Sequence, residues 1–148
     1  MALKSIRLGL SALAFAVVAA TFAAARATAQ EIEYFNVPAS QGITLGPDGA
    51  MWLPIGLNAI GRMDTNGTVT GVFPLPNGIT LPAGIAAGPD GNLWFTTRLP
   101  SAIGRITPFG TIRMFPLSPS SLPYAITAGP DGNLWFTMPG SNSIGRIT

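Results

Sequence analysis

The chain has 148 residues, of which 47% are hydrophobic and only 9% are charged, and its formal net charge at pH 7 is +2. It contains no cysteine and no histidine, which excludes disulfide bridges, thiolate metal sites, a cysteine nucleophile and an imidazole general base. The 18 glycines and 14 prolines, in a chain so poor in charge, indicate a β protein with many tight turns.

Residues 1–29 have the pattern of a secretory signal peptide. Two basic residues precede an apolar run at 8–25, and an Ala-Thr-Ala pattern follows it, so we expect cleavage between Ala29 and Gln30. A retained membrane helix is the alternative, because a run of about 18 residues reaches the lower limit for one. The flanking residues favour the leader, and we therefore expect an exported protein, periplasmic or extracellular, without a stable membrane span after cleavage.

Removal of this leader reverses the sign of the net charge. Lys4, Arg7 and Arg26 lie within the leader, whereas all six acidic residues lie beyond it. The mature chain, residues 30–148, then has five basic residues against six acidic ones, a formal charge of −1. No basic face remains, and nucleic acid is not an expected partner.

Residues 31–37 resemble, through Tyr34 and Phe35, the last strand of the repeats that follow. We expect this segment to be a closing strand that pairs with the last repeat of a ring.

Three tandem repeats of about 42 residues follow, at 42–83, 84–124 and 125–148. Each repeat contains the turn sequence Gly-Pro-Asp-Gly, a tryptophan at a fixed distance from it, and then Ile-Gly-Arg. These landmarks begin at Gly46, Gly88 and Gly129, at Trp52, Trp94 and Trp135, and at Ile60, Ile103 and Ile144. Repetition of this kind predicts stacked copies of one supersecondary unit.

The second repeat shows the pattern of that unit most clearly. Its hydrophobic residues alternate with a period near two, and turn sequences interrupt them. The expected elements are strands at 84–87, 92–97, 103–107 and 111–117, a tight turn at 88–91 and a loop at 99–102. Four antiparallel strands per repeat predict an all-β partial β-propeller of about three four-stranded blades. An open parallel β-solenoid is the alternative.

The repeated side chains are expected to be structural. The three tryptophans would lie in the core between blades, although stacking on a ligand is the alternative. Asp48, Asp90 and Asp131 recur in the turns, and Arg62, Arg105 and Arg146 recur after them. We expect these residues to form Asp–Arg pairs within or between blades; carboxylate or phosphate binding by the arginines is the alternative.

The segments at 126–137 and 144–148, which read Ile-Thr-Ala-Gly-Pro-Asp-Gly-Asn-Leu-Trp-Phe-Thr and Ile-Gly-Arg-Ile-Thr, resemble the streptogramin lyase (virginiamycin B lyase-like) family. The same words recur in the second repeat and, in weaker form, in the first. The resemblance implies a seven-bladed propeller in complete members, and a magnesium-dependent C–O elimination that linearises type B streptogramin antibiotics at their ester bond, a form of antibiotic resistance.

The resemblance also implies where the catalytic residues of a complete lyase would stand. One position, a histidine before the first strand of a blade, is held here by Gln41, Ala83 and Tyr124. The other, a glutamate after Trp-Phe-Thr, is held by Ile55, Thr97 and Met138. We therefore expect no catalytic residue, no metal ligand and no cofactor in this chain, although Mg²⁺ is implied for the complete enzyme. Tyr124 is the one candidate ligand-binding residue, and a structural aromatic at the channel rim is its alternative.

The third repeat contains only three of the four expected strands. We expect a truncated product or fragment, or alternatively self-association of chains that complete a ring between them. The expected function is that of an exported fragment resembling a streptogramin lyase but inactive as it stands. The alternative is a noncatalytic propeller module that binds a small molecule or a partner protein.

Overall fold

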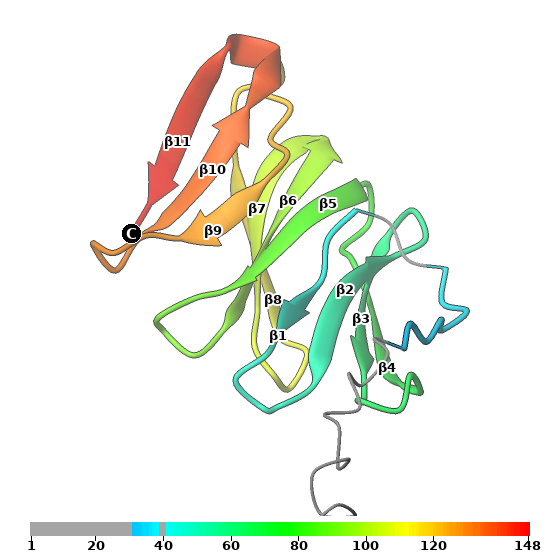
Figure 1. Ribbon diagram of the computed structural model, residues 1–148. Helices are drawn as coiled ribbons and strands as arrows, with labels where there is room; N and C mark the ends of the chain where they lie inside the picture. The colour runs from blue at the N-terminus through cyan, green and yellow to red at the C-terminus, as the bar shows by residue number, and fades with distance from the viewer. Residues whose placement is uncertain (1–30, 39–40) are drawn as a thin grey trace, which may run out of the picture. The chain divides into compact units, whose positions relative to one another are not determined.

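The computed structural model describes residues 31–38 and 41–148, and these form an all-β arrangement of three sheets (Figure 1). The first sheet contains β1 (Thr44–Leu45), β2 (Met51–Ile55), β3 (Ala59–Met63) and β4 (Val69–Pro74). The second contains β5 (Thr80–Ala87), β6 (Leu93–Leu99), β7 (Ser101–Ile106) and β8 (Ile112–Pro116). The third contains β9 (Ile126–Ala128), β10 (Leu134–Met138) and β11 (Ser143–Ile147), and a 3-10 turn at Pro139–Ser141 joins its last two strands.

Every strand pair in the three sheets is antiparallel and joins neighbours in the sequence. Strand β5 contacts both β1 and β9, so the first strands of the three sheets line one side of the molecule. This arrangement confirms the predicted partial propeller of about three blades, the third with three strands among the described residues. The parallel solenoid alternative is wrong.

Two boundaries in the second repeat differ from those expected. Strand β5 begins at Thr80 rather than at residue 84, because Thr80 and Pro82 pair with the end of β6 across a bulge. The expected loop at 99–102 is a two-residue turn, since Arg98 pairs directly with Ser101. Both differences make the strands longer than expected, and strands β6 and β7 stay paired up to the turn that joins them.

Side chains alternate between the two faces of each sheet and fill the space between neighbouring sheets. Trp52 of β2 is fully buried and stacks on Phe73 of β4, with ring centroids 5.3 Å apart. Both rings belong to a cluster that includes four residues of the second sheet, Ile85, Leu93, Phe95 and Ile106. The tryptophan therefore faces the following blade, as the repeat predicted.

The second interface repeats the first. Trp94 stacks on Phe115 at 5.5 Å, and both pack with Ile126, Leu134 and Phe136 of the third sheet. Trp135 differs from the expectation of a core residue: it is exposed, because the described residues contain neither a following sheet nor a fourth-strand phenylalanine to cover it.

The glycine of the Ile-Gly-Arg element gives the neighbouring aromatic side chain its space. The ring of Phe95 lies over Gly104 on the adjacent strand, and a Cβ at Gly104 would overlap this ring. Phe136 lies over Gly145 in the same way. The glycine and the aromatic residue are thus one packing unit in these two sheets.

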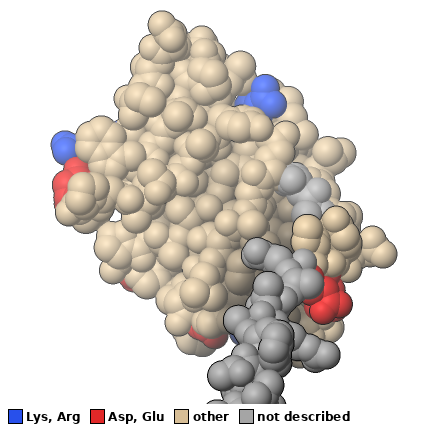
Figure 2. Space-filling model, viewed as in Figure 1, with Lys and Arg blue, Asp and Glu red and all other residues tan. Residues whose placement is uncertain are grey.

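The N-terminal part of the described chain has no regular structure. The expected signal peptide, residues 1–29, lies outside the described residues. Residues 31–38 form no strand, so the pairing of a closing strand at 31–37 stays a prediction. No helix in the described ranges is long and apolar enough to cross a membrane. The face of the molecule shown in Figure 2 is largely uncharged, with acidic and basic side chains only at isolated places.

Candidate functional site

The repeated aspartates hold the tryptophan and the arginine of their own repeat. Asp48 accepts a hydrogen bond of 2.9 Å from the Trp52 indole N–H and one of 2.6 Å from Nε of Arg62. Arg62 also donates to Thr70 across the sheet. The Asp–Arg contact thus lies within a blade.

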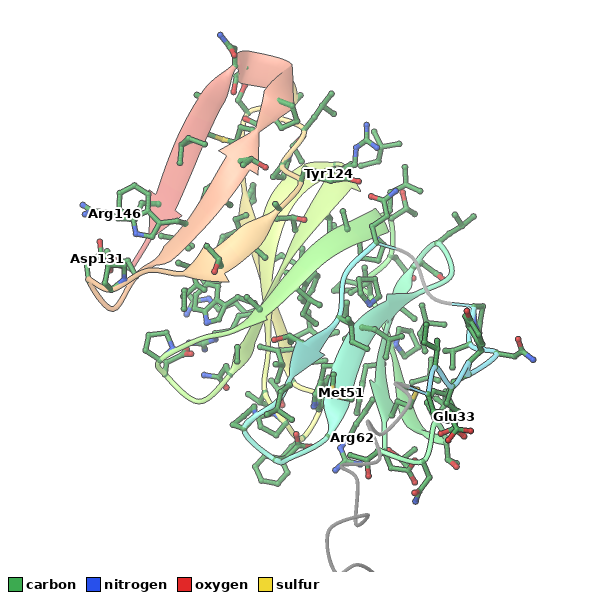
Figure 3. All side chains as sticks on the ribbon, in the orientation of Figure 1. Glu33, Met51, Arg62, Tyr124, Asp131 and Arg146 are labelled. Carbon is green, nitrogen blue, oxygen red and sulfur yellow. The ribbon has the colours of Figure 1, made fainter. Side chains whose placement is uncertain are left out.

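The later repeats keep this arrangement with longer ion pairs. Arg105 lies 3.6 Å from Asp90 and Arg146 lies 3.4 Å from Asp131, and each guanidinium also lies over the indole of its repeat. Figure 3 shows Asp131 and Arg146 beside each other, at the end of the third sheet away from Tyr124. Because the side chains of these pairs are partly exposed and screened by solvent, the pairs contribute little stability by themselves, and their role is to fix the indole.

The same contacts lower the pKa of the aspartates. Burial alone would raise the pKa of Asp90, but hydrogen bonds from Asn92 and Trp94 and the charge of Arg105 lower it below 3.8. Burial would also raise the pKa of Asp48, but the hydrogen bonds from Trp52 and Arg62 outweigh this effect and lower the pKa. The indole of Trp135 and the amide of Asn133 lower the pKa of Asp131 furthest. All three carboxylates are therefore ionised when they bind their indoles.

We expect the fold to lose stability in acid through these aspartates. A carboxyl whose pKa is lower in the folded chain stabilises it above the unfolded value of 3.8, and this contribution disappears as the pH falls through the folded pKa. The thermal unfolding midpoint should stay constant from about pH 7 to about pH 5 and then fall below about pH 4. Asp90→Asn should flatten this fall. Equal acid dependence in the wild type and the variant, followed by circular dichroism, would contradict the assignment.

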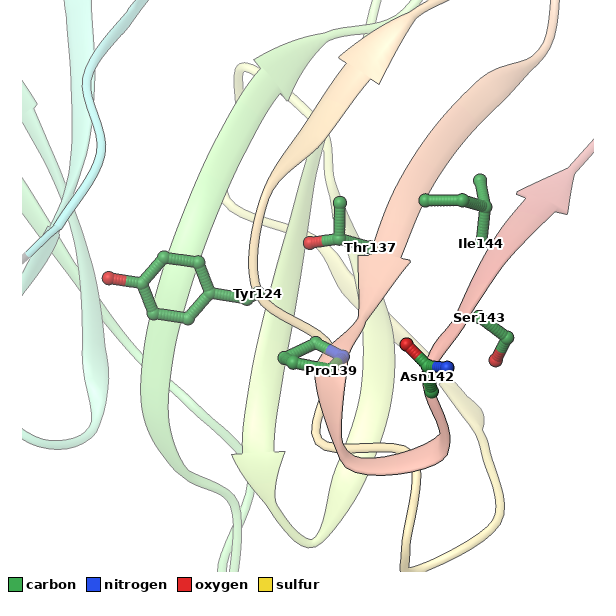
Figure 4. A pocket seen from close by; sticks show the side chains of 6 residues that line it. All are labelled: Tyr124, Thr137, Pro139, Asn142, Ser143 and Ile144. Atoms are coloured by element: carbon green, nitrogen blue, oxygen red, sulfur yellow. The ribbon is translucent and has the colours of Figure 1, made fainter.

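At the other end of the sheets lie the residues that precede the first strands. Tyr124 is exposed and lines a cavity of about 400 Å³ with five other residues, Thr137, Pro139, Asn142, Ser143 and Ile144 (Figure 4). Its backbone is fixed: the N–H donates to Thr137 O, and the carbonyl accepts from Gly84 N and Thr96 Oγ1. The backbone position of Tyr124 is therefore fixed by hydrogen bonds, and its phenol ring points away from the other five side chains (Figure 4).

The two repeat equivalents of Tyr124 have different environments. Ala83 is buried and offers no functional group. Gln41 is exposed and lines two smaller cavities of about 180 Å³ each, one of which also includes Tyr124. Gln41 and Tyr124 therefore border the same hollow beside the first strands.

Arg98 is a residue of this region that the sequence reasoning missed. It is half-buried at the end of β6 and lines the other small cavity together with Gln41 and Ala83. The described residues include no carboxylate within ion-pair distance of it. Its repeat equivalents are Gly56 and Pro139, and this departure from the repeat was the signal available in the sequence.

The three residues at the glutamate position are all used in packing or in local hydrogen bonds. Ile55 lies over Gly61, and Met138 packs against the core between the second and third sheets. Thr97 is fully buried, and its hydroxyl donates to Pro100 O at 3.0 Å. None of them supplies a carboxylate for Mg²⁺, and residues 31–38 and 41–148 contain no group of three or more potential metal-ligating side chains of the His, Cys, Asp and Glu types. The residues present do not fit the metal.

Comparisons with known proteins agree with the fold. Residues 10–148 match the model of the virginiamycin B lyase family. Virginiamycin B lyase from Staphylococcus aureus superimposes with a TM-score of 0.71 at 40% sequence identity, covering 80% of this chain and 42% of the lyase. A catalytically inactive variant of that enzyme with quinupristin gives a TM-score of 0.73 at 40% identity, covering 82% of this chain and 43% of the other.

A streptogramin B lyase structure is 45% identical, with a TM-score of 0.66, and the match covers 72% of this chain and 36% of the lyase. The chain thus spans less than half the length of these solved lyases. No curated protein matches it. The family model covers nearly the whole sequence, and the chain belongs to the virginiamycin B lyase family.

Proposed function

We propose that the chain is an exported binding module that takes a type B streptogramin at the end of the sheets bordered by Gln41, Arg98 and Tyr124, and that it does not open the antibiotic ring as it stands. The main support is the similarity at 40% identity to a virginiamycin B lyase solved with quinupristin. The second support is that the cavities of this chain are lined by Gln41, Ala83 and Tyr124, which hold the position that the family resemblance assigns to a catalytic histidine.

The shape and chemistry of the cavity suit a largely apolar ligand with a few polar groups. Its volume of about 400 Å³ lies within the usual range for small-molecule sites. Tyr124 borders this cavity and a smaller one that also includes Gln41, and it offers an aromatic face and one hydroxyl on a fixed backbone, at small entropic cost. Arg98 lines a separate cavity of about 180 Å³ with Gln41, where it can donate to carbonyl oxygens of a peptide ligand.

The histidine and glutamate positions of the family, by contrast, do not carry the groups that an elimination reaction needs in this chain. An elimination needs a base that removes a proton and a group that stabilises the leaving oxygen. The three histidine positions carry an amide, a methyl group and a phenol, and the glutamate positions carry no acid. Binding without turnover is therefore the function that these residues support.

The test measures binding and turnover of quinupristin separately. Titration calorimetry should show binding to the wild type with and without Mg²⁺, and mass spectrometry of the same mixtures should show no ring-opened product. Tyr124→Ala should weaken binding by about tenfold, the loss of one aromatic contact. Phe109→Ala, which removes an exposed ring from the turn after β7, is the control and should bind as the wild type does.

Two outcomes would overturn the proposal. Ring opening by the wild type would show that the module is an enzyme. Absence of binding, or equal binding by the Tyr124→Ala variant and the wild type, would remove the assigned site.

A further inference from the structure

Two arginines face each other across strands β7 and β8 of the second sheet. Arg105 and Arg113 are direct cross-strand partners, so their side chains lie on the same face of the sheet. The Arg105 guanidinium lies over the indole of Trp94, 5.7 Å from its centroid. The Arg113 guanidinium lies over the ring of Phe115 at 5.1 Å. Since like charges directly opposite each other destabilise a sheet, this pair calls for a counter-charge.

The first blade has no such pair of like charges. Gly71 stands opposite Arg62 at the equivalent place. Arg62 instead donates to Asp48 at 2.6 Å and to the hydroxyl of Thr70 at 2.7 Å. Its guanidinium is therefore bound within its own blade.

In the second blade a neighbouring amide occupies the aspartate. Asn92 donates its side-chain amide to Oδ2 of Asp90 at 2.7 Å, and the equivalent oxygen of the first blade binds the arginine. Ala50, the equivalent of Asn92 in the first blade, has no amide to donate. Arg105 accordingly lies 3.6 Å from Asp90, and no carboxylate of the described residues lies within ion-pair distance of Arg113. The two cations thus share one loosely held counter-charge.

Both arginines line a cavity of about 330 Å³ between the second and third sheets. The cavity lies at the end of the sheets that carries the Gly-Pro-Asp-Gly turns, and Asp90 borders it as well. Its other lining side chains include the apolar groups of Pro89, Phe115 and Leu134. The volume lies within the usual range for small-molecule sites.

We propose that Arg105 and Arg113 bind the carboxylate of a small aromatic acid in this cavity. A guanidinium group can donate two parallel hydrogen bonds to a carboxylate. The two arginines and Asp90 together carry one positive charge, which a single carboxylate neutralises. A phosphate dianion would exceed this balance and would lie close to the Asp90 carboxylate. The apolar lining suits an aromatic ring attached to the carboxylate, and the site does not depend on the proposed function.

The test compares benzoate with benzamide, which has the same ring without the charge. The isotope-labelled wild-type chain is titrated with each compound, and the Nε–H signals of its arginines are followed by nuclear magnetic resonance. Benzoate should shift the signals of Arg105 and Arg113 to saturation, and added salt should weaken its binding. Benzamide should bind at least about tenfold more weakly, because it lacks the charge-assisted hydrogen bonds. Inorganic phosphate should also bind more weakly than benzoate.

Three variants locate the binding site. Arg113→Gln should weaken benzoate binding by about tenfold and leave the thermal unfolding midpoint unchanged, because it removes a charge that has no partner in the described chain. Asn92→Ala restores the residue of the first blade at a position that does not line the cavity. It should free Asp90 to bind Arg105 closely and so weaken benzoate binding by about threefold or more. Arg98→Gln removes an equal charge at the other end of β6 and should leave benzoate binding unchanged.

Four results would overturn the proposal. The first is that benzoate does not bind, and the second is that it binds the wild type and the Arg113→Gln variant equally well. The third is loss of benzoate binding in the Arg98→Gln variant, which would place the anion in the other cavity. The fourth is binding of phosphate as tight as that of benzoate, which would assign the arginines to a different anion. A negative result with quinupristin would leave this proposal unaffected.

Discussion

Trp52→Ala should destabilise the chain by about 3–5 kcal/mol, the usual range for removing a fully buried tryptophan. The indole fills the space between the first two sheets, stacks on Phe73 and donates to Asp48. Its loss therefore leaves a cavity between the blades and a carboxylate without its strongest neutral donor. Urea unfolding followed by far-UV circular dichroism measures the change.

The matched control is Trp135→Ala. The same residue type stands at the same repeat position and donates to Asp131, but no further sheet of the described residues covers it. In dilute solution its removal should cost only about 1 kcal/mol. Equal losses for the two variants would mean that the tryptophans do not join neighbouring blades.

Gly104→Ala is the second substitution with a large expected effect, about 1–3 kcal/mol. An added Cβ would overlap the Phe95 ring, which is fully buried between the first two sheets and has no room to withdraw. The backbone of β7 or the ring must therefore shift. Unfolding in urea again gives the magnitude.

The double variant Gly104→Ala with Phe95→Leu is the check on this explanation. Leucine vacates the space directly over residue 104, so the double variant should cost less than the two single variants added together. Strict additivity would show that the glycine is required for another reason.

Much of the fold could be predicted from the repeated sequence motifs. Gly-Pro-Asp-Gly fixes a turn, and alternation around Trp94 and Phe95 sends the two rings to opposite faces, so both the hairpins and the two interfaces were predictable. The extension of β5 back to Thr80 was not, because it depends on pairing with the end of β6 across a bulge rather than on local preference.

The candidate site was predictable only in part. Tyr124 was identified because the resemblance to the streptogramin lyases includes a Pro-Tyr pair at this position. Arg98 differs from its repeat equivalents, but its position beside the same cavity as Gln41 depends on the tight turn after β6, which was expected to be a longer loop. The exposure of Trp135 was not predictable from its local sequence, because the residues around it are the same as those around the buried Trp94. It is exposed because the described residues contain no neighbouring sheet to cover it.

Hydrogen exchange of the backbone amides, read by mass spectrometry in dilute solution, tests the radial stacking of the sheets most directly. Strand β6 lies in the middle of the second sheet, which among the three described sheets is covered on both faces, so its amides should exchange more slowly than those of β10, which also lies between two strands but in a sheet with an open face. Exchange of β6 as fast as that of β10 would contradict the stacking of these sheets through their tryptophans.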